Sequence, residues 1–460
     1  MEQSLGKKVD FSGIIEQLGA EITFVNNGFC FEFMSKPYDF RDNHHDIVKI
    51  MPDEHGFVYG KLHDGRGIAI YTGQELPIIG NRTFATWCYI IVQDYDDMSR
   101  LNCIDGIRFF GGTVDTLYPP RSLGHDFENH SKNAFALKYT PDKTVFDLSA
   151  SELKGRLELE SVITAGHRDK KGFYMMNDGS RMDLLFDQCI NLSNIEKLYN
   201  TIIAVLRFLS FRENVGFERI ALLKRDNSFS EDDFYLEYAE CHIPCSDSLT
   251  QRDSQRCISF RMLDSEKITK LFDAIMHETE RKSSYCISFL PADDSKSMSV
   301  DNDIIKSTVS AIECELELAK LKLPKDEKME ALKKQVIRIV KESEDKSELN
   351  DKAYSVIFGS IDHWGDSLSN RIYEIYLLHK DEMAVFFKDL PEYDFNKAEI
   401  EKLVIYRNDI THGRYRVNNL DVACATLCLM ALVYCCILTR IGMEKSQIKS
   451  IMESGAFLYN

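Results

Sequence analysis

The pattern of apolar and polar positions divides the chain into a β-rich first part and a helical second part. In residues 1–190, short segments rich in Val, Ile, Phe, Tyr and Thr alternate apolar with polar positions, which is typical of strands. Turn sequences such as Asn26-Asn27-Gly28 and Asn177-Asp178-Gly179 separate them. We expect residues 1–190 to form an antiparallel, sandwich-like β domain. The predicted strands are Glu21–Val25, Phe29–Phe33, Phe57–Leu62, Gly67–Tyr71, Phe84–Val92, Ala134–Tyr139, Arg156–Val162, Gly172–Met176 and Arg181–Phe186.

Residues 191–300 mix the two patterns and are expected to form an α+β extension of the N-terminal region. Residues 193–211 have helical periodicity, and a second helix is predicted near Ser265–Glu278. Residues 291–303 are polar and contain few apolar side chains, so the main domain boundary is expected there.

Residues 301–460 have the pattern of an all-α bundle. Pro and Gly are rare, and the apolar positions recur at the spacing of amphipathic helices. The predicted helices are Ile304–Leu321, Lys325–Glu342, Leu349–Ile361, Leu368–Leu378, Asn396–His412, Leu420–Ile441 and Glu444–Met452.

Composition and charge limit the possible functions. The chain has 460 residues, of which 44% are hydrophobic and 28% charged, as in ordinary globular domains. The net charge of −17 argues against a protein that coats nucleic acids, because such proteins are basic. It leaves open a selective nucleic-acid enzyme with a small basic site. Residues 402–420 supply such a site, since they contain Asp409 but four cations, Lys402, Arg407, Arg414 and Arg416.

The cysteines and one apolar run bear on localisation. Thirteen cysteines are scattered along the chain and the N-terminal segment is polar, which predicts reduced thiols in the cytoplasm. Residues 422–438 are almost all apolar, at the lower limit of what crosses a membrane. The favoured interpretation is a fully buried core helix and no membrane association. A membrane-tethered sensor is the alternative.

The end of the helix predicted at Asn396–His412 carries the strongest candidate site. Arg407 falls on an apolar stripe with Leu403 and Ile410, and a buried guanidinium needs an anionic or polar partner. Asn408 and His412 are four residues apart and therefore share a helix face. The next residue, Gly413, favours termination of the helix. A guanidinium, an amide and an imidazole are thus expected close together.

This stretch resembles the Rx4-6H motif of HEPN domains, with Arg407, four intervening residues and His412. The preceding segment Ser367-Leu368-Ser369-Asn370-Arg371-Ile372 is similar to the helix before this motif in ApeA-like HEPN proteins. The segment Tyr59-Gly60-Lys61-Leu62-His63-Asp64-Gly65 resembles the ApeA N-terminal domain more weakly. The resemblance covers roughly residues 300–460.

The resemblance implies a metal-independent endoribonuclease that acts as a homodimer, or a higher even oligomer, with a composite site. It also implies bacterial defence against phage by abortive infection, with the N-terminal region regulating the nuclease and sensing a phage-derived trigger. Arg407, His412 and Asn408 would be catalytic, and Lys402, Arg414 and Arg416 would bind the RNA, with tRNA as one possible substrate. No cofactor or metal is implied.

Two alternatives stay open for these residues. Arg407 could pair with Glu399 or Glu401 of a second copy while His412 only caps the helix C-terminus, where a cation is favoured. The domain would then be a non-catalytic HEPN-like dimerisation module that carries a β-sandwich ligand sensor.

Metal and phosphate motifs are weaker. Cys241 and Cys245, with Cys257 and Cys286 further on, could bind zinc, but buried thiols are favoured because no second closely spaced pair follows. His44-His45-Asp46 lies in a polar segment that favours a solvated loop. Gly111-Gly112 matches neither the dinucleotide nor the P-loop pattern.

Overall fold

The computed structural model of the chain describes most of its residues. The described ranges are 11–17, 20–35, 48–78, 81–120, 142–150, 153–168, 172–226, 234–244, 254–280, 285–293, 296, 299–320, 327–345, 350–362, 367–384, 393–414 and 419–453.

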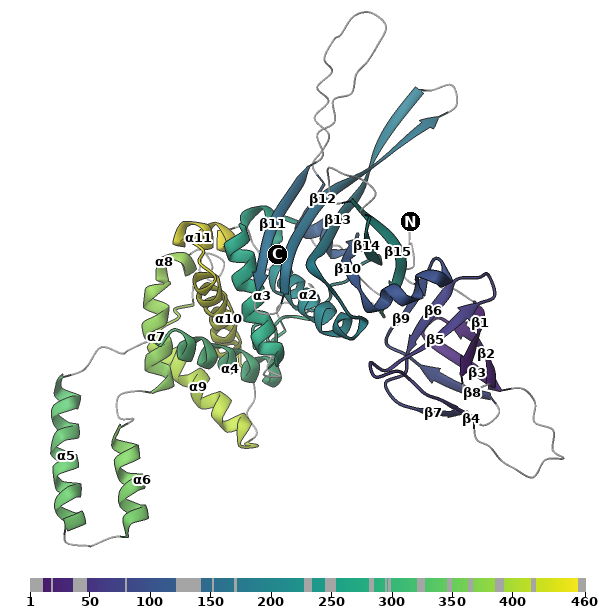
Figure 1. The fold of residues 1–460 in the computed structure, drawn as a ribbon. Coiled ribbons are helices and arrows are strands. Elements are labelled where there is room, and N and C mark those ends of the chain that lie inside the picture. The colour runs from purple at the N-terminus through teal and green to yellow at the C-terminus, as the bar shows by residue number, and fades with distance from the viewer. Residues whose placement is uncertain are drawn as a thin grey trace, which may run out of the picture. The chain divides into compact units, whose positions relative to one another are not determined.

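The chain folds as two compact units, Met1–His277 and Glu278–Asn460. Unit 1 contains an antiparallel β sheet and unit 2 is helical (Figure 1). The predicted fold class, a β-rich N-terminal region before an all-α region, is therefore confirmed. The boundary between the two units lies between His277 and Glu278, before the polar segment 291–303, so the strands and helices of residues 195–277 fall in unit 1.

Thirteen of the 15 described strands of unit 1 pair as one continuous antiparallel sheet. The order is β11-β12-β13-β10-β14-β15-β9-β6-β5-β1-β2-β3-β8, and β4 pairs with β7 in a separate ribbon. The strands are β1 (Ser12–Gln17), β2 (Ala20–Asn27), β3 (Cys30–Ser35), β4 (Val48–Ile50), β5 (Phe57–Leu62), β6 (Gly67–Tyr71), β7 (Leu76–Ile78), β8 (Asn81–Ala85), β9 (Tyr89–Val92), β10 (Ile104–Phe110), β11 (Lys143–Ala150), β12 (Leu153–Arg168), β13 (Gly172–Ile190), β14 (Arg219–Asp226) and β15 (Phe234–His242).

The N-terminal strands curl around their own apolar core (Figure 1). Phe24, Phe31 and Phe33 are fully buried in it, and the rings of Phe31 and Tyr89 meet edge to face at 5.5 Å. Alternation explains this core, because every second side chain of a strand points to the same face.

Three α-helices accompany the remaining strands of unit 1 within the described residues. The helices of unit 1 are α1 (Thr113–Leu117), α2 (Ile195–Ser210) and α3 (Ser265–Glu280), the last of which runs across the unit boundary. The 3-10 helices are η1 (Tyr95–Asn102), η2 (Leu192–Asn194), η3 (Ser254–Arg256) and η4 (Phe260–Met262). Ser265 accepts a hydrogen bond of 3.0 Å from the backbone N–H of Asp147, and Thr269 donates to the Asp147 carbonyl at 3.4 Å. Side chains of α3 thus form hydrogen bonds with backbone groups of the edge strand β11 that no neighbouring described strand pairs with.

One predicted turn is wrong. Asn177-Asp178-Gly179 was expected to separate two strands, but β13 runs straight through it. The register with β12 shifts there, since Val162 pairs with Gly179 and the next residue, Ile163, pairs with Asn177. Asp178 is the extra residue of a β-bulge. Glycine and aspartate are common both in β-bulges and in turns, so the sequence did not distinguish the two. The predicted strand Ala134–Tyr139 lies outside the described residues.

The prediction of fully reduced thiols is also wrong for one pair. A disulfide joins Cys103 and Cys189, which stand at neighbouring ends of β10 and β13, where Ile104 pairs with Ile190. The two cysteines are 86 residues apart in the sequence, so only the pairing of these strands brings them together.

Unit 2 is a helical bundle around α10. The helices are α4 (Asn302–Leu318), α5 (Glu327–Asp345), α6 (Asp351–Asp362), α7 (Leu368–Leu378), α8 (Lys380–Met383), α9 (Lys397–Thr411), α10 (Leu420–Arg440) and α11 (Lys445–Glu453). Helix α10 packs against α4, α8, α9 and α11, and its side chains from Cys424 to Leu438 are all buried. Helices α5 and α6 pack chiefly against each other.

The long apolar helix α10 meets the length and composition of a membrane span, with a mean hydropathy of 2.4 over its most apolar window. Most of that window, 89%, is buried inside the fold. Burial on all sides agrees with the favoured interpretation of a core helix.

Candidate functional site: the end of helix α9

Local sequence sets where α9 begins and ends. The Asn396 side chain accepts hydrogen bonds from the backbone N–H groups of Ala398 and Glu399, at 2.9 and 3.2 Å, which caps the N-terminus. At the other end, Gly413 has φ = +73°, a conformation that glycine adopts without strain. The helix therefore ends at Thr411, one residue before the last residue of the candidate motif, His412.

The apolar stripe of α9 is rotated slightly from the predicted one. The buried side chains are Ile400, Leu403, Tyr406 and Asp409, whereas Arg407 lies at the edge of the stripe with 21% of its side chain exposed. Asp409 can be buried because its carboxylate accepts a hydrogen bond of 3.0 Å from Arg414. Arg407 consequently faces the boundary between the bundle and solvent.

The Arg407 guanidinium has two partners from the same chain. Its Nη2 donates to Oε2 of Glu313 on α4, and its Nη1 donates to Oδ1 of Asn408 at 3.1 Å. The sequence suggested Glu399 or Glu401 of a second copy as the carboxylate. In this structure Glu399 instead accepts from Lys402 at 2.6 Å, and Glu313 is the partner of Arg407.

His412 is exposed immediately after the last residue of α9. Its backbone N–H donates to the Asn408 carbonyl at 3.0 Å, which continues the helical pattern. Because the Asn408 amide oxygen accepts from Arg407, Asn408 orients the guanidinium and not the imidazole in this structure. The imidazole of His412 remains accessible to a substrate.

Helix α4 fixes the orientation of α9 at two points. Tyr406 donates from its hydroxyl to Oδ1 of Asn302 at 3.1 Å, at the beginning of α4, while Arg407 reaches Glu313 further along that helix. Helix α7, which Ser367 caps by accepting from the Asn370 N–H at 3.2 Å, also packs against α9. The motif thus stands on a supported helix rather than on a loop.

The three predicted RNA-binding cations differ in their exposure and in their carboxylate partners. Lys402 is exposed, and its hydrogen bond to Glu399 raises its pKa. Arg414 is 74% exposed and pairs with Asp409. Arg416 lies outside the described residues. Two of the cations are thus partly neutralised by carboxylates of α9 itself, so the local positive field is weaker than the charge count implies.

Glu313 is the residue of this site that the sequence did not identify. Helix α4 carries Glu313, Glu315 and Glu317, and nothing in their local pattern distinguishes one from another. Glu315 is buried and binds Arg440 through both oxygens, at 2.8 and 3.2 Å, while Glu313 meets Arg407. Only the packing of α4 against α9 and α10 assigns a separate arginine to each.

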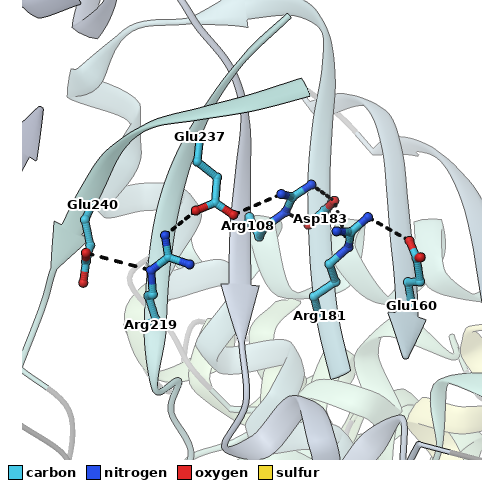
Figure 2. Close-up of polar contacts among 7 residues, drawn as sticks. All are labelled: Arg108, Glu160, Arg181, Asp183, Arg219, Glu237 and Glu240. Carbon is cyan, nitrogen blue, oxygen red and sulfur yellow. Dashed lines mark hydrogen bonds and ion pairs between the residues drawn. The ribbon is translucent and has the colours of Figure 1, made fainter. Parts of the chain in front are cut away.

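A second group of paired charges crosses the sheet of unit 1 (Figure 2). We call it the sheet network; it consists of Glu160, Arg181, Asp183, Arg108, Glu237, Arg219 and Glu240. These side chains occupy the face of the sheet opposite to the apolar one, because they alternate with buried residues such as Phe109 and Leu184. Arg108 stands directly across from Asp183, and Glu160 across from Arg181.

Arg108 is the centre of the sheet network. It binds Asp183 through Nε and Nη2, both at 2.8 Å, and Glu237 through Nη1 at 3.0 Å. Burial acts to lower the pKa of Arg108, but the two carboxylates outweigh it and raise the pKa. Burial likewise acts to raise the pKa of Glu237, and Arg219 and Arg108 outweigh it and lower that pKa. Every charged side chain of the sheet network is paired with another member of the network, which is typical of a structural role.

A cavity of about 440 Å³ opens in unit 1. Its lining includes two arginines and two aspartates, Arg156, Arg225, Asp147 and Asp187, together with Tyr235. The volume falls within the range of small-molecule sites, and the charges balance. A ligand there would be neutral or would carry both signs of charge.

The weaker metal candidates find no support among the described side chains. No group of three potential ligands occurs in the part of the chain that the structure describes. Cys241 instead lies with its Sγ 3.8 Å from that of Cys88. His44, His45 and Cys245 lie outside the described residues.

Comparison of the chain with known proteins identifies no relative. No protein-family model, curated protein or solved structure matches the chain.

Proposed function

We propose that the end of α9 is the active centre of a metal-independent, HEPN-type endoribonuclease. One observation carries the proposal: Arg407 and His412 stand at the same end of a supported helix, the guanidinium oriented from two sides and the imidazole exposed. A cation that stabilises charge on the phosphate and an accessible titratable ring that transfers protons are the two groups needed to cleave a phosphodiester without a metal.

The chemistry uses the nucleophile that RNA itself carries. The 2′-hydroxyl loses its proton to a histidine and attacks the adjacent phosphorus, and the bond to the 5′-oxygen breaks as that oxygen gains a proton from a second acid. The products are a 2′,3′-cyclic phosphate and a 5′-hydroxyl. Histidine suits both proton transfers because its ordinary pKa is near 6.5.

Arg407 stabilises the negative charge that develops on the phosphate oxygens. Its planar fork can bind two oxygens at once and stays charged at every physiological pH. A preorganised donor of this kind contributes a factor on the order of 10²–10³ in rate. Asn408 holds Nη1 at 3.1 Å and so limits the rotation of the guanidinium.

A composite site made from two copies supplies both the base and the acid. Each copy brings one His412 to the pair, so one imidazole removes the proton and the other donates one. In this proposal the protein is a homodimer or a higher even oligomer of the cytoplasm. It serves abortive defence against phage, and unit 1 restrains the nuclease until a phage-derived trigger binds.

The test is an RNA cleavage assay with the purified full-length chain in EDTA. We expect cyclic-phosphate and 5′-hydroxyl ends, and a loss of at least about a thousandfold in rate for His412→Ala. His277→Ala, which removes an exposed histidine from α3, is the matched control and should cleave normally. Ends with a 5′-phosphate, a requirement for Mg²⁺, or full activity of His412→Ala would refute the proposal.

The second candidate is a non-catalytic dimerisation module whose N-terminal region senses a ligand. The cavity in unit 1 favours it, because a volume of about 440 Å³ with balanced charges can accept a small polar molecule. Phage protection in cells separates the two. Protection that survives His412→Ala but is lost on filling the cavity, for example with Ser149→Trp, would support the module.

A further inference from the structure

We propose that Glu313 is an internal competitor of the RNA phosphate, so that Arg407 binds substrate by exchanging one anion for another. The inference rests on the proposed function, since it concerns how the same site recognises its substrate. Arg407 donates to Oε2 of Glu313 through Nη2, the edge of the fork that a phosphate oxygen would otherwise take.

The ion pair between Arg407 and Glu313 can be broken at little cost in free energy. Of the two side chains, Arg407 is 21% and Glu313 34% exposed, so water reaches both partners. An ion pair of this kind is worth little by itself, because solvent screens it and both side chains lose freedom by pairing. A phosphodiester that arrives at Nη2 can therefore displace the carboxylate, which then turns to solvent instead of remaining buried.

Glu315 on the same helix shows the opposite arrangement. It is two residues further along, about 200° around the helix axis, and only 2% of its side chain is exposed. It holds Arg440 with both oxygens, and the Tyr285 hydroxyl lies 3.2 Å from the same guanidinium. Removing such a partner leaves a buried charge, so this second pair cannot exchange.

The exchange makes the site selective for polyanions. A tethered carboxylate has a high local concentration at Arg407, so a single phosphate competes with it poorly. An RNA strand adds neighbouring phosphates that can meet exposed cations such as Lys402, and their combined binding displaces Glu313. An RNA strand, rather than a free mononucleotide, is therefore the expected ligand.

Asn408 keeps the guanidinium in place during the exchange. Its amide oxygen binds Nη1, which Glu313 does not use, so this contact persists when Nη2 changes partner. Glu313 therefore determines affinity, whereas Asn408 positions Arg407.

The experiment measures binding of fluorescein-labelled single-stranded RNA by anisotropy at low salt, in full-length chains that also carry His412→Ala to prevent cleavage. We expect Glu313→Gln and Glu313→Ala each to tighten binding by about threefold to tenfold. Glu317→Gln is the matched control, because it removes the same charge one turn away on α4. It should change binding less than about twofold.

Two further measurements separate competition from other roles. In an Arg407→Ala background, Glu313→Gln should lose its effect, since no guanidinium remains to be released. Inorganic pyrophosphate should inhibit RNA binding more strongly in Glu313→Gln than in the chain with Glu313.

Several outcomes would overturn the inference. Equal effects of Glu313→Gln and Glu317→Gln would mean general electrostatics, and weaker binding by Glu313→Ala would mean that Glu313 supports Arg407. No RNA binding by any variant would also overturn it. A cleavage assay is read separately: tighter binding that depends on Arg407, without His412-dependent cleavage, would uphold the competition and refute the proposed nuclease.

Discussion

Arg108 in unit 1 and Arg407 in unit 2 are both paired with carboxylates, yet their surroundings differ in every respect that matters for function. Arg108 is 11% exposed and is held by Asp183 and Glu237 from two different strands. Arg407 has one carboxylate partner, from a neighbouring helix, and lies five residues before the exposed His412. A guanidinium saturated by buried partners stabilises a fold, whereas one with a single, partly exposed partner can still bind a ligand.

The comparison also shows why charge in the sequence is a poor guide to sites. Both arginines lie in elements with nearby acidic residues, and neither element is strongly basic. The distinction arises from burial and from the number of partners, which are properties of the fold. It can be tested by removing each arginine in turn.

The largest expected effect is on stability when Arg108 is replaced. Arg108→Met leaves Asp183, of which only 4% is exposed, without its bidentate partner, and we expect a loss of about 3–5 kcal/mol in the free energy of unfolding. Arg407→Met, the matched variant, should cost less than about 1 kcal/mol. Urea denaturation at pH 7 measures both. Equal losses in the free energy of unfolding would contradict the proposed difference between the two arginines.

The two glutamates of α4 provide the next test. Glu315→Gln weakens a buried bidentate pair with Arg440, and we expect it to cost about 2–3 kcal/mol. Glu313→Gln should change stability by less than about 0.5 kcal/mol, because its pair is partly exposed. Thermal denaturation of the two variants under one condition distinguishes them. A larger loss for Glu313→Gln would contradict the exchangeable role of that pair.

Asp115 tests a carboxylate whose pKa is shifted in the opposite direction to that of Glu237. Burial raises its pKa to about 6, the nearby Glu218 adds to this, and the Ser180 N–H, 2.6 Å from Oδ1, opposes it. A raised carboxyl pKa means that its stabilising contribution is complete below the unfolded value near 4 and is lost as the pH rises through about 6.

We therefore expect Asp115→Asn to be more stable than the natural chain at pH 7.5, by about 1 kcal/mol. The full linkage value is reduced because the carboxylate keeps contact with solvent. The difference should disappear near pH 4. Melting temperatures measured from pH 4 to pH 8 check this, and an advantage that is independent of pH would rule out ionisation as its cause.

Much of unit 2 could be predicted from the sequence because its helices are long and their apolar spacing is regular. The bounds of α7 match the prediction, and those of α9 and α10 differ from it by a residue. In unit 1, by contrast, the short strand β10 was missed, since Ile104–Phe110 contains a glycine and only partial alternation. The Asn177-Asp178-Gly179 segment was misassigned because bulges and turns use the same residues.

The candidate site divides in the same way. Arg407, Asn408 and His412 could be found because they lie within one helix end, where spacing alone sets their proximity. Glu313 could not, because it is 94 residues away and two other glutamates stand within four positions of it. The disulfide between Cys103 and Cys189 was missed for the same reason: strand pairing, not spacing, brings its two cysteines together.

The smallest expected effect concerns Lys402, whose side chain is 60% exposed and already paired with Glu399. If RNA extends along α9 from the candidate site, Lys402→Ala should weaken binding only about twofold to threefold at low salt. It should also lower the slope of log affinity against log salt concentration by about 1, as for one lost phosphate contact. Lys449→Ala, which removes an exposed lysine from α11, is the control and should leave the slope unchanged. Equal slopes for the natural chain and both variants would place the strand elsewhere on unit 2, and the selectivity for polyanions would then have to come from Arg407 alone.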